Sequence, residues 1–197
     1  MRLGKLLLAV VAAAVLFGAF VASASARNLS FSEQRVIGLW TQLRFTGGFG
    51  TVECEIKMSR SIHSRTFTKT FNSLIGYVTE ATVLRCSSGG MTINQASFPW
   101  HLRFLAFLGT LPNLTGERGR TIGVEWTLRE PVFGITCTVR ATEAGEIIYI
   151  YTISSGTVTR EEITSEGSRC GGVAGSLSGT TTNVTASAGA RVTLLLI

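Results

Sequence analysis

Apolar and polar residues alternate with a period of two along most of this chain, and that pattern constrains the fold more than any other feature. Every second residue from Val52 to Met58 is apolar, and the residues between them are mostly charged. TIGVEWTLR (residues 121–129) and FGITCTVRA (residues 133–141) repeat the pattern, with Ile135 on the apolar face. Since successive side chains of a strand point to opposite faces, each segment predicts a strand with one face on a core and one in water.

Two further segments are apolar on both faces. EIIYIYTIS (residues 146–154) and the closing RVTLLLI (residues 191–197) predict strands that are central in a sheet or covered on both sides. The one helix candidate is SFSEQRVIGLWTQL (residues 30–43), which a serine could cap, and the same residues also suit a first strand. About nine or ten short strands separated by glycine-containing turns predict an antiparallel β-sandwich, with a closed β-barrel as the alternative.

The N-terminus has the layout of a secretory signal peptide. Arg2 and Lys5 form a short positive region, residues 6–22 are continuously apolar, and Ala24-Ser25-Ala26 is a small-residue cleavage box. We expect residues 1–26 to be removed, which leaves residues 27–197 as one all-β domain with no membrane span, secreted or extracellular. An uncleaved anchor helix is the alternative, although the apolar run lies at the lower edge of what spans a bilayer.

The four cysteines lie beyond the signal segment and predict two disulfides, because an even number in an oxidising compartment usually pairs. Three pairings are possible, and we favour Cys54–Cys86 with Cys137–Cys170. In each half of the chain, a strand cysteine is followed roughly thirty residues later by a cysteine beside a Gly-Gly turn. The spacing suits no metal site, so we expect neither a metal nor another cofactor.

The composition excludes several classes of function. All 12 acidic residues are glutamates, so a triad or a calcium loop built on aspartate is impossible. The formal net charge of +6 falls to +4 without residues 1–26, and it is spread along the chain, so we expect no nucleic-acid partner. No serine stands in a G-x-S-x-G elbow, and the glutamate pairs Glu53/Glu55 and Glu161/Glu162 have the pattern of solvated charge.

The most distinctive stretch is SFPWHLRFLAFLGTLPNLTG, residues 97–116. Trp100, Leu102 and Phe104 fall on one face of a predicted strand, while His101 and Arg103 point together from the other. An imidazole beside a guanidinium is a candidate base or anion-binding pair. A strand with a solvated polar face, followed by a turn, is the simpler interpretation.

The second histidine lies in SRSIHSRTFTKTF (residues 59–71), the densest basic stretch. Its basic residues are either a contact for an anionic polymer or an exposed strand whose charges prevent edge pairing, and we favour the second. These residues are Arg60, His63, Arg65 and Lys69. The candidate binding residues of the whole chain are His101, Arg103, His63 and Arg65, and no catalytic residue is assigned.

Three segments resemble those of a group of secreted proteins of high-GC Gram-positive bacteria that have no assigned activity. They are SLIGYVTEATVLRC (residues 73–86), Phe98-Pro99-Trp100-His101 and Gly109-Thr110-Leu111-Pro112-Asn113. The resemblance covers most of residues 40–197. It implies export and an all-β domain, and it carries over no functional residue.

These features predict an exported, non-enzymatic binding or structural module of the cell envelope or the extracellular space. Its ligand would be an anionic or carbohydrate polymer of the envelope. The alternative is a secreted hydrolase that uses His101 or His63 with a glutamate, and it requires the two groups to lie within hydrogen-bond reach.

Overall fold

Antiparallel β-strands are the dominant element of the described structure, as predicted. The computed structural model describes residues 28–48, 50–110, 113–129, 134–142, 147–170 and 173–197, so the predicted signal peptide lies outside it. The largest sheet has the order β13-β12-β11-β8-β7-β5-β3-β2-β14, and β13 also pairs with β2. Eight strands therefore form a closed ring in which each has two neighbours. They are β2 (Arg35–Gly47), β3 (Gly50–Ile62), β5 (Leu74–Cys86), β7 (Trp100–Thr110), β8 (Asn113–Ile122), β11 (Ile147–Ser154), β12 (Thr157–Cys170) and β13 (Val173–Thr181).

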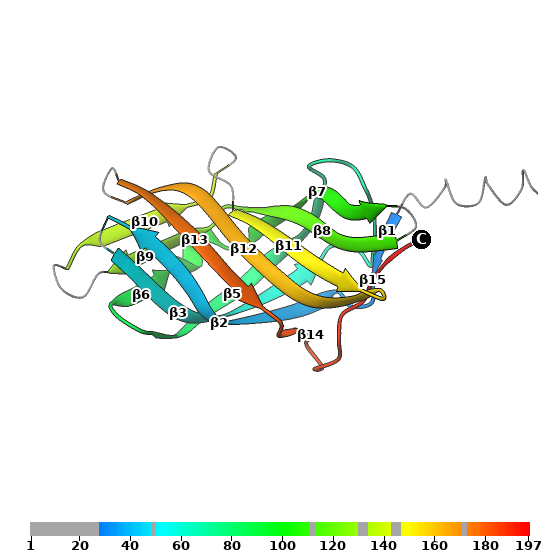
Figure 1. Cartoon of the computed structure of the whole chain (residues 1–197), viewed down its shortest axis with the longest axis horizontal. Helices are drawn as coiled ribbons and strands as arrows, with labels where there is room; N and C mark the ends of the chain where they lie inside the picture. The colour runs from blue at the N-terminus through cyan, green and yellow to red at the C-terminus, as the bar shows by residue number, and fades with distance from the viewer. Residues whose placement is uncertain (1–27, 49, 111–112, 130–133, 143–146, 171–172) are drawn as a thin grey trace, which may run out of the picture.

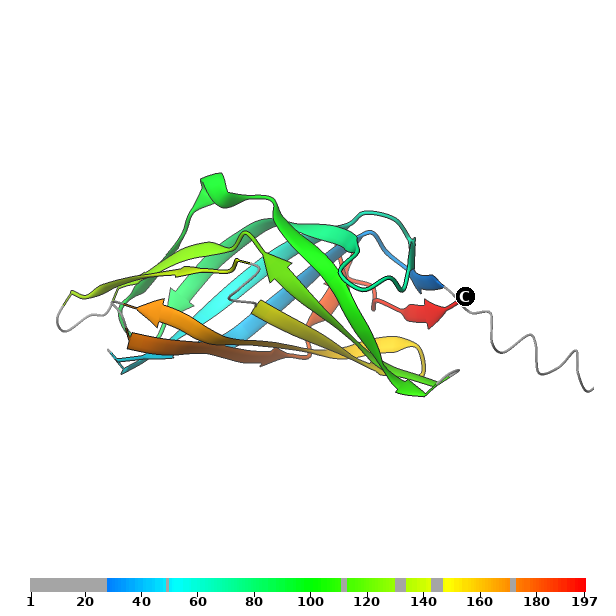
Figure 2. The ribbon, with the colours of Figure 1, turned by 90° about the horizontal axis from the view of Figure 1, so that it is seen from above.

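The ring strands cross the molecule at a slant and enclose a common interior (Figures 1 and 2). The short strand β14 (Val184–Ala186) continues the pairing beside the first half of β2. The pairings within this sheet are antiparallel, from β2 with β3 through to β12 with β13. The side chains that alternate inward fill the interior and make the core.

A small three-stranded sheet covers one end of the ring. Its order is β15 (Leu194–Leu196), β1 (Asn28–Phe31) and β4 (Thr66–Thr68), and in Figure 1 β1, β15 and the C-terminus lie at this end. Phe31 packs edge-on against Tyr151 of β11, with ring centroids 6.3 Å apart. Phe67 lies 6.2 Å from Phe104 of β7. Two aromatic side chains thus close the interior here.

A second three-stranded sheet covers the opposite end. It has the order β10 (Thr136–Arg140), β9 (Glu125–Arg129) and β6 (Gly90–Ile93), and a short 3-10 helix, Gln95–Ser97, follows β6. Trp126 of β9 meets Phe45 of β2 and Trp100 of β7 edge to face, at centroid distances of 5.3 and 5.7 Å. Because aromatic rings bury large areas, these contacts fix the small sheet onto the ring.

Most of the predicted strand faces are confirmed. The apolar side chains from Val52 to Met58 are buried on β3, and residues 30–43 form strands β1 and β2, so the helix alternative is wrong. The segment 121–129 is not one strand but the end of β8 and the whole of β9. The chain turns between them at Gly123, whose φ of +89° favours glycine.

Two predicted faces are wrong. Ile135 is 46% exposed because it precedes β10 rather than lying within it. The closing segment 191–197 forms an edge strand, β15, which pairs only with β1 in its sheet, so Leu195 and Ile197 are exposed. By contrast, β11 lies between β8 and β12 in the ring, which agrees with the prediction of a central strand for residues 146–154.

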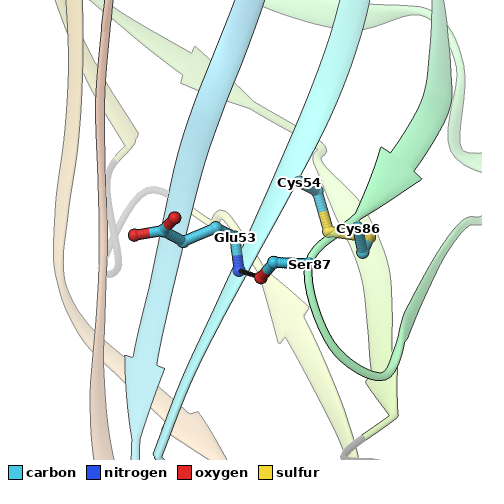
Figure 3. Close-up of a disulfide and its surroundings, with 4 residues drawn as sticks. All are labelled: Glu53, Cys54, Cys86 and Ser87. Carbon is cyan, nitrogen blue, oxygen red and sulfur yellow. Dashed lines mark hydrogen bonds between the residues drawn. A yellow bond between two sulfur atoms is a disulfide. The ribbon is translucent and has the colours of Figure 1, made fainter.

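The Cys54–Cys86 disulfide is confirmed (Figure 3). The two cysteines are cross-strand partners on β3 and β5, and beside them the Glu53 N–H donates to Ser87 Oγ at 3.4 Å. Cys137 is buried on β10, which lies against β12, and no described cysteine is a free thiol. The side chain of Cys170 lies outside the described residues, so its bond to Cys137 stays a prediction.

Replacing both Cys54 and Cys86 by alanine should lower the free energy of unfolding by roughly 3–4 kcal/mol, because the bridge restricts an unfolded chain over a sequence separation of 32 residues. Urea titration followed by tryptophan fluorescence measures the change. Ser87→Ala, which removes one long hydrogen bond beside the bridge, is the control and should cost about 1 kcal/mol or less. An unfolding midpoint equal to that of the wild type in the double variant would contradict this account.

Candidate functional site

His101 and Arg103 point outward from β7, as predicted, but they make separate contacts. His101 is exposed, and its ring meets Tyr77 of β5 edge to face at 5.5 Å. Arg103 is half-buried and donates from Nη1 to the Asn72 carbonyl at 3.0 Å. Asn72 is thereby held in the turn before β5.

His63 and Arg65 lie in the connection between β3 and β4, where both are exposed. They do not continue β3 as an exposed strand, because β3 ends at Ile62. His63 and His101 are two strands apart, on either side of β5. No hydrogen bond joins either imidazole to a described glutamate, so the geometry that the hydrolase alternative requires is not found among the described residues.

Polar side chains that the sequence analysis left outside the core form a cluster inside the ring. We call it the interior cluster. It consists of Trp40, Arg60, Glu117, Tyr149, Tyr151 and Glu161. The predictions for Arg60 and Glu161 as solvated residues are wrong, since their side chains are only 2% and 0% exposed.

The centre of the interior cluster is an ion pair across the ring. Arg60 on β3 donates to both carboxylate oxygens of Glu161 on β12, at 2.6 and 2.7 Å. The same guanidinium donates to the Tyr151 hydroxyl at 2.9 Å and lies 5.0 Å from the centre of the Trp40 ring. Burial alone would lower the pKa of Arg60, but the attraction of Glu161 and the two tyrosines, together with the hydrogen bond to Glu161, outweighs burial and raises that pKa. Burial raises the pKa of Glu161, and the charge and hydrogen bonds of Arg60 oppose that rise. The bidentate contact at 2.6 and 2.7 Å is that of a guanidinium with a carboxylate, so the pair is ionised.

Glu117 on β8 is the second carboxyl group of the interior cluster and lacks a cation of its own. It is fully buried, the Tyr149 hydroxyl donates to its Oε1 at a long 3.4 Å, and Oε2 has no described partner. Burial raises the pKa of Glu117 well above its usual value, while the Tyr149 hydrogen bond opposes the rise. Burial also raises the pKa of the Tyr149 phenol. Glu117 is thus a neutral carboxylic acid inside the ring.

Glycine creates the space that the interior cluster needs. Gly119 on β8 is the cross-strand partner of Tyr149, and a Cβ at that position would collide with the Tyr149 ring. A Cβ at Gly38 would likewise collide with Trp40 and approach Glu161. Each aromatic ring therefore occupies space that a side chain at the glycine position would need.

The alternation of side chains along each strand was the signal in the sequence that could have located part of this cluster. Arg60 continues the inward series that runs from Val52 to Met58, so alternation alone places it inside. Glu161 is two residues from the buried Ile163, so both side chains lie on the same face of β12. Charged residues rarely enter a core unless they are paired, and the partner across the ring cannot be read from either segment alone.

The interior cluster has acid, cation and phenol groups, yet all of them are enclosed by strands and by Phe31. No group of three or more potential metal ligands occurs among the residues that the structure describes. None of those residues forms a helix long and apolar enough to cross a membrane. The arrangement joins β3 to β12 across the interior, and its charged side chains are buried from solvent.

Basic residues from three separate segments meet at the end of the ring that carries β1 and β15. We call Arg35, His63, Arg65 and Arg191 the basic end. All four are exposed, and none belongs to an ion pair with a described carboxylate. The half-buried Glu33 is the acidic residue nearest to them in sequence.

Backbone hydrogen bonds hold these three segments together. The Arg65 carbonyl accepts from the Phe31 N–H at 2.7 Å, and the Arg35 carbonyl accepts from the Ser187 N–H at 3.1 Å. Two residues before Ser187, a β-bridge joins the chain to Arg191. Positions far apart in sequence thus present positive charge on one end of the molecule.

No protein-family model, no curated protein and no solved structure matches this chain.

Glu161→Gln should lower the free energy of unfolding by about 3–5 kcal/mol, because it leaves the Arg60 charge buried without a counter-ion. The adjacent Glu162 provides a matched control. It points outward to Arg160 at 3.3 Å in an exposed pair, so Glu162→Gln should cost about 1 kcal/mol or less. Urea unfolding at neutral pH measures both variants. Equal costs would show that the buried pair does not contribute as described.

Glu117→Gln should stabilise the protein by an amount that grows with pH. In the unfolded chain Glu117 loses its proton near pH 4.3, whereas in the folded chain it keeps the proton to a higher pH. The contribution of Glu117 to the free energy of unfolding is therefore fully present below about pH 4.3. It falls by about 1.4 kcal/mol per pH unit as the pH rises toward the raised folded pKa, and glutamine removes this dependence. Thermal unfolding from pH 4 to pH 8 measures the difference, with the exposed Glu80→Gln as the control. A difference between wild type and Glu117→Gln that is independent of pH would refute the assignment.

Proposed function

We propose that this chain is an exported, non-catalytic binding module of the cell envelope, built on a closed β-barrel, that binds an anionic envelope component through the basic end. The pairing of β13 with β2 supports the barrel, because the edges of an open sandwich sheet do not meet. The observation that carries the binding proposal is the meeting of Arg35, Arg65 and Arg191 at one end without described carboxylate partners.

Export is supported by the disulfide and by the sequence of the N-terminus. The Cys54–Cys86 bridge suits an oxidising compartment. Residues 1–26 have the layout of a signal peptide, and they precede β1 directly.

A binding role without chemistry is supported by where the reactive groups lie. The Glu117 acid and the Arg60–Glu161 pair are enclosed in the ring, whereas the charges at the basic end face solvent. Exposed cations on a rigid scaffold attract polyanions over about a Debye length, and salt weakens that attraction. The scaffold fixes the spacing of the charges, because the ring and the end sheet hold each segment by backbone pairing.

The experiment is sedimentation of the protein with a total envelope fraction that contains both wall and membrane. The triple variant Arg35→Ala, Arg65→Ala, Arg191→Ala should bind at least about tenfold more weakly than wild type, and salt should weaken wild-type binding. The control removes three arginines from the other end: Arg44→Ala, Arg85→Ala, Arg129→Ala. Because both variants lose the same charge, equal binding by the two would mean that the basic end is not the contact.

A further inference from the structure

We propose that the envelope component is the surface of a lipid bilayer that contains anionic lipids, and that the module docks on it with the basic end. This inference rests on the proposed function and names its partner. It comes from a second property of the same end, which is the exposure of large apolar side chains.

Six large apolar side chains are exposed in the part of the chain that the structure describes, and four of them lie near the basic end. We call these four the apolar rim. They are Phe71 (72% exposed), Leu108 (37%), Leu195 (49%) and Ile197 (55%). The other two, Leu84 and Ile135, lie toward the opposite end, near Cys86 and just before β10.

Pairing in the small end sheet brings two rim residues together. Ile197 and Asn28 exchange two backbone hydrogen bonds, at 3.2 and 3.0 Å, and Asn28 pairs with Thr68 of β4. Phe71 follows Thr68 by three residues, in the turn that leads to β5. The C-terminal segment and this turn are therefore neighbours across the end of the ring (Figure 1).

The remaining two rim residues border the same sheet. Leu195 lies on β15, and a Cβ added at Gly156, in the turn between β11 and β12, would collide with its side chain. Leu108 lies near the end of β7, next to Phe107, and the Lys69 ammonium is 5.2 Å from the Phe107 ring. Lys69 follows β4 directly, so it joins the positive charge to the apolar rim.

A bilayer surface suits this combination better than a hydrophilic polymer does. Anionic headgroups attract arginine and lysine, and the headgroup–acyl boundary accepts apolar side chains that would otherwise face water. A soluble wall polymer would satisfy the arginines but would gain little from Phe71, Leu195 and Ile197.

The test is co-flotation of the chain with vesicles of phosphatidylcholine alone and with vesicles that also contain about one third phosphatidylglycerol. We expect binding to the second kind only. Phe71→Ser with Leu195→Ser should weaken it by about tenfold or more, because the apolar contact is lost while the charge is unchanged. The matched control, Leu84→Ser with Ile135→Ser, removes two side chains of similar exposure at the opposite end and should bind as wild type does.

All variants begin at Arg27, without the predicted signal peptide, so differences among them report the rim alone. Circular dichroism and thermal unfolding should show that both double variants fold, and Phe71→Ser alone, at the most exposed position, provides a milder second variant. If the rim variants bind phosphatidylglycerol vesicles as tightly as the control, the lipid contact is overturned.

A parallel assay with delipidated cell wall separates this inference from the proposed function. Binding to wall but not to vesicles, with loss in the triple arginine variant, would overturn the lipid partner and leave the envelope-binding function standing. Binding to neither would overturn both. Binding to vesicles with loss in both the arginine and the rim variants supports both.

Discussion

The ion pair between Arg60 and Glu161 lies across the interior of the ring, and the strands and side chains around it must accommodate its geometry. Two charges removed from water are stable only if each satisfies the other, and the bidentate geometry with distances of 2.6 and 2.7 Å meets that condition. The pair fixes β3 relative to β12, which are separated along the ring by β2 and β13. Tyr151, which accepts a hydrogen bond from Arg60, packs against Phe31 of the end sheet, so this sheet helps to keep water away from the pair. The packing of Trp40 over the guanidinium and the neutral state of Glu117 follow from the same lack of solvent.

The fold could be predicted from the sequence to the extent that it depends on alternation. Val52 to Met58 gave the inward face of β3 correctly, and the strand cysteine at Cys54 was rightly paired with Cys86. What alternation could not supply was the relation between strands. Segment 121–129 reads as one continuous strand, yet Gly123 turns the chain from the ring into an end sheet. The segment 191–197 is apolar enough for a central strand, but the topology places β15 at an edge, where Leu195 meets solvent.

The candidate site residues, too, could be predicted from the sequence only where alternation decides whether a side chain is exposed. The alternation of polar residues and the density of basic residues predict that His101, His63 and Arg65 are exposed. The structure agrees for all three. Arg60 belongs to the same basic stretch but lies inside the ring, because alternation along β3 points its side chain inward. The carboxylate of Glu161 balances its charge there. Neither the interior cluster nor the basic end could be assembled from sequence. Each joins residues that are far apart in the chain, and only the closed pairing and the end sheet bring them together.

The pairing of β13 with β2 closes the ring, and it can form only after most of the chain has been synthesised. It joins Ser176–Ser178 to Arg44–Thr46, on the last and first strands of the ring, so it is the least local pairing within the ring. Until β13 arrives, β2 and β12 each present an open row of amide and carbonyl groups, which are templates for pairing with another chain. A nascent chain therefore remains vulnerable to self-association until nearly its whole length is available.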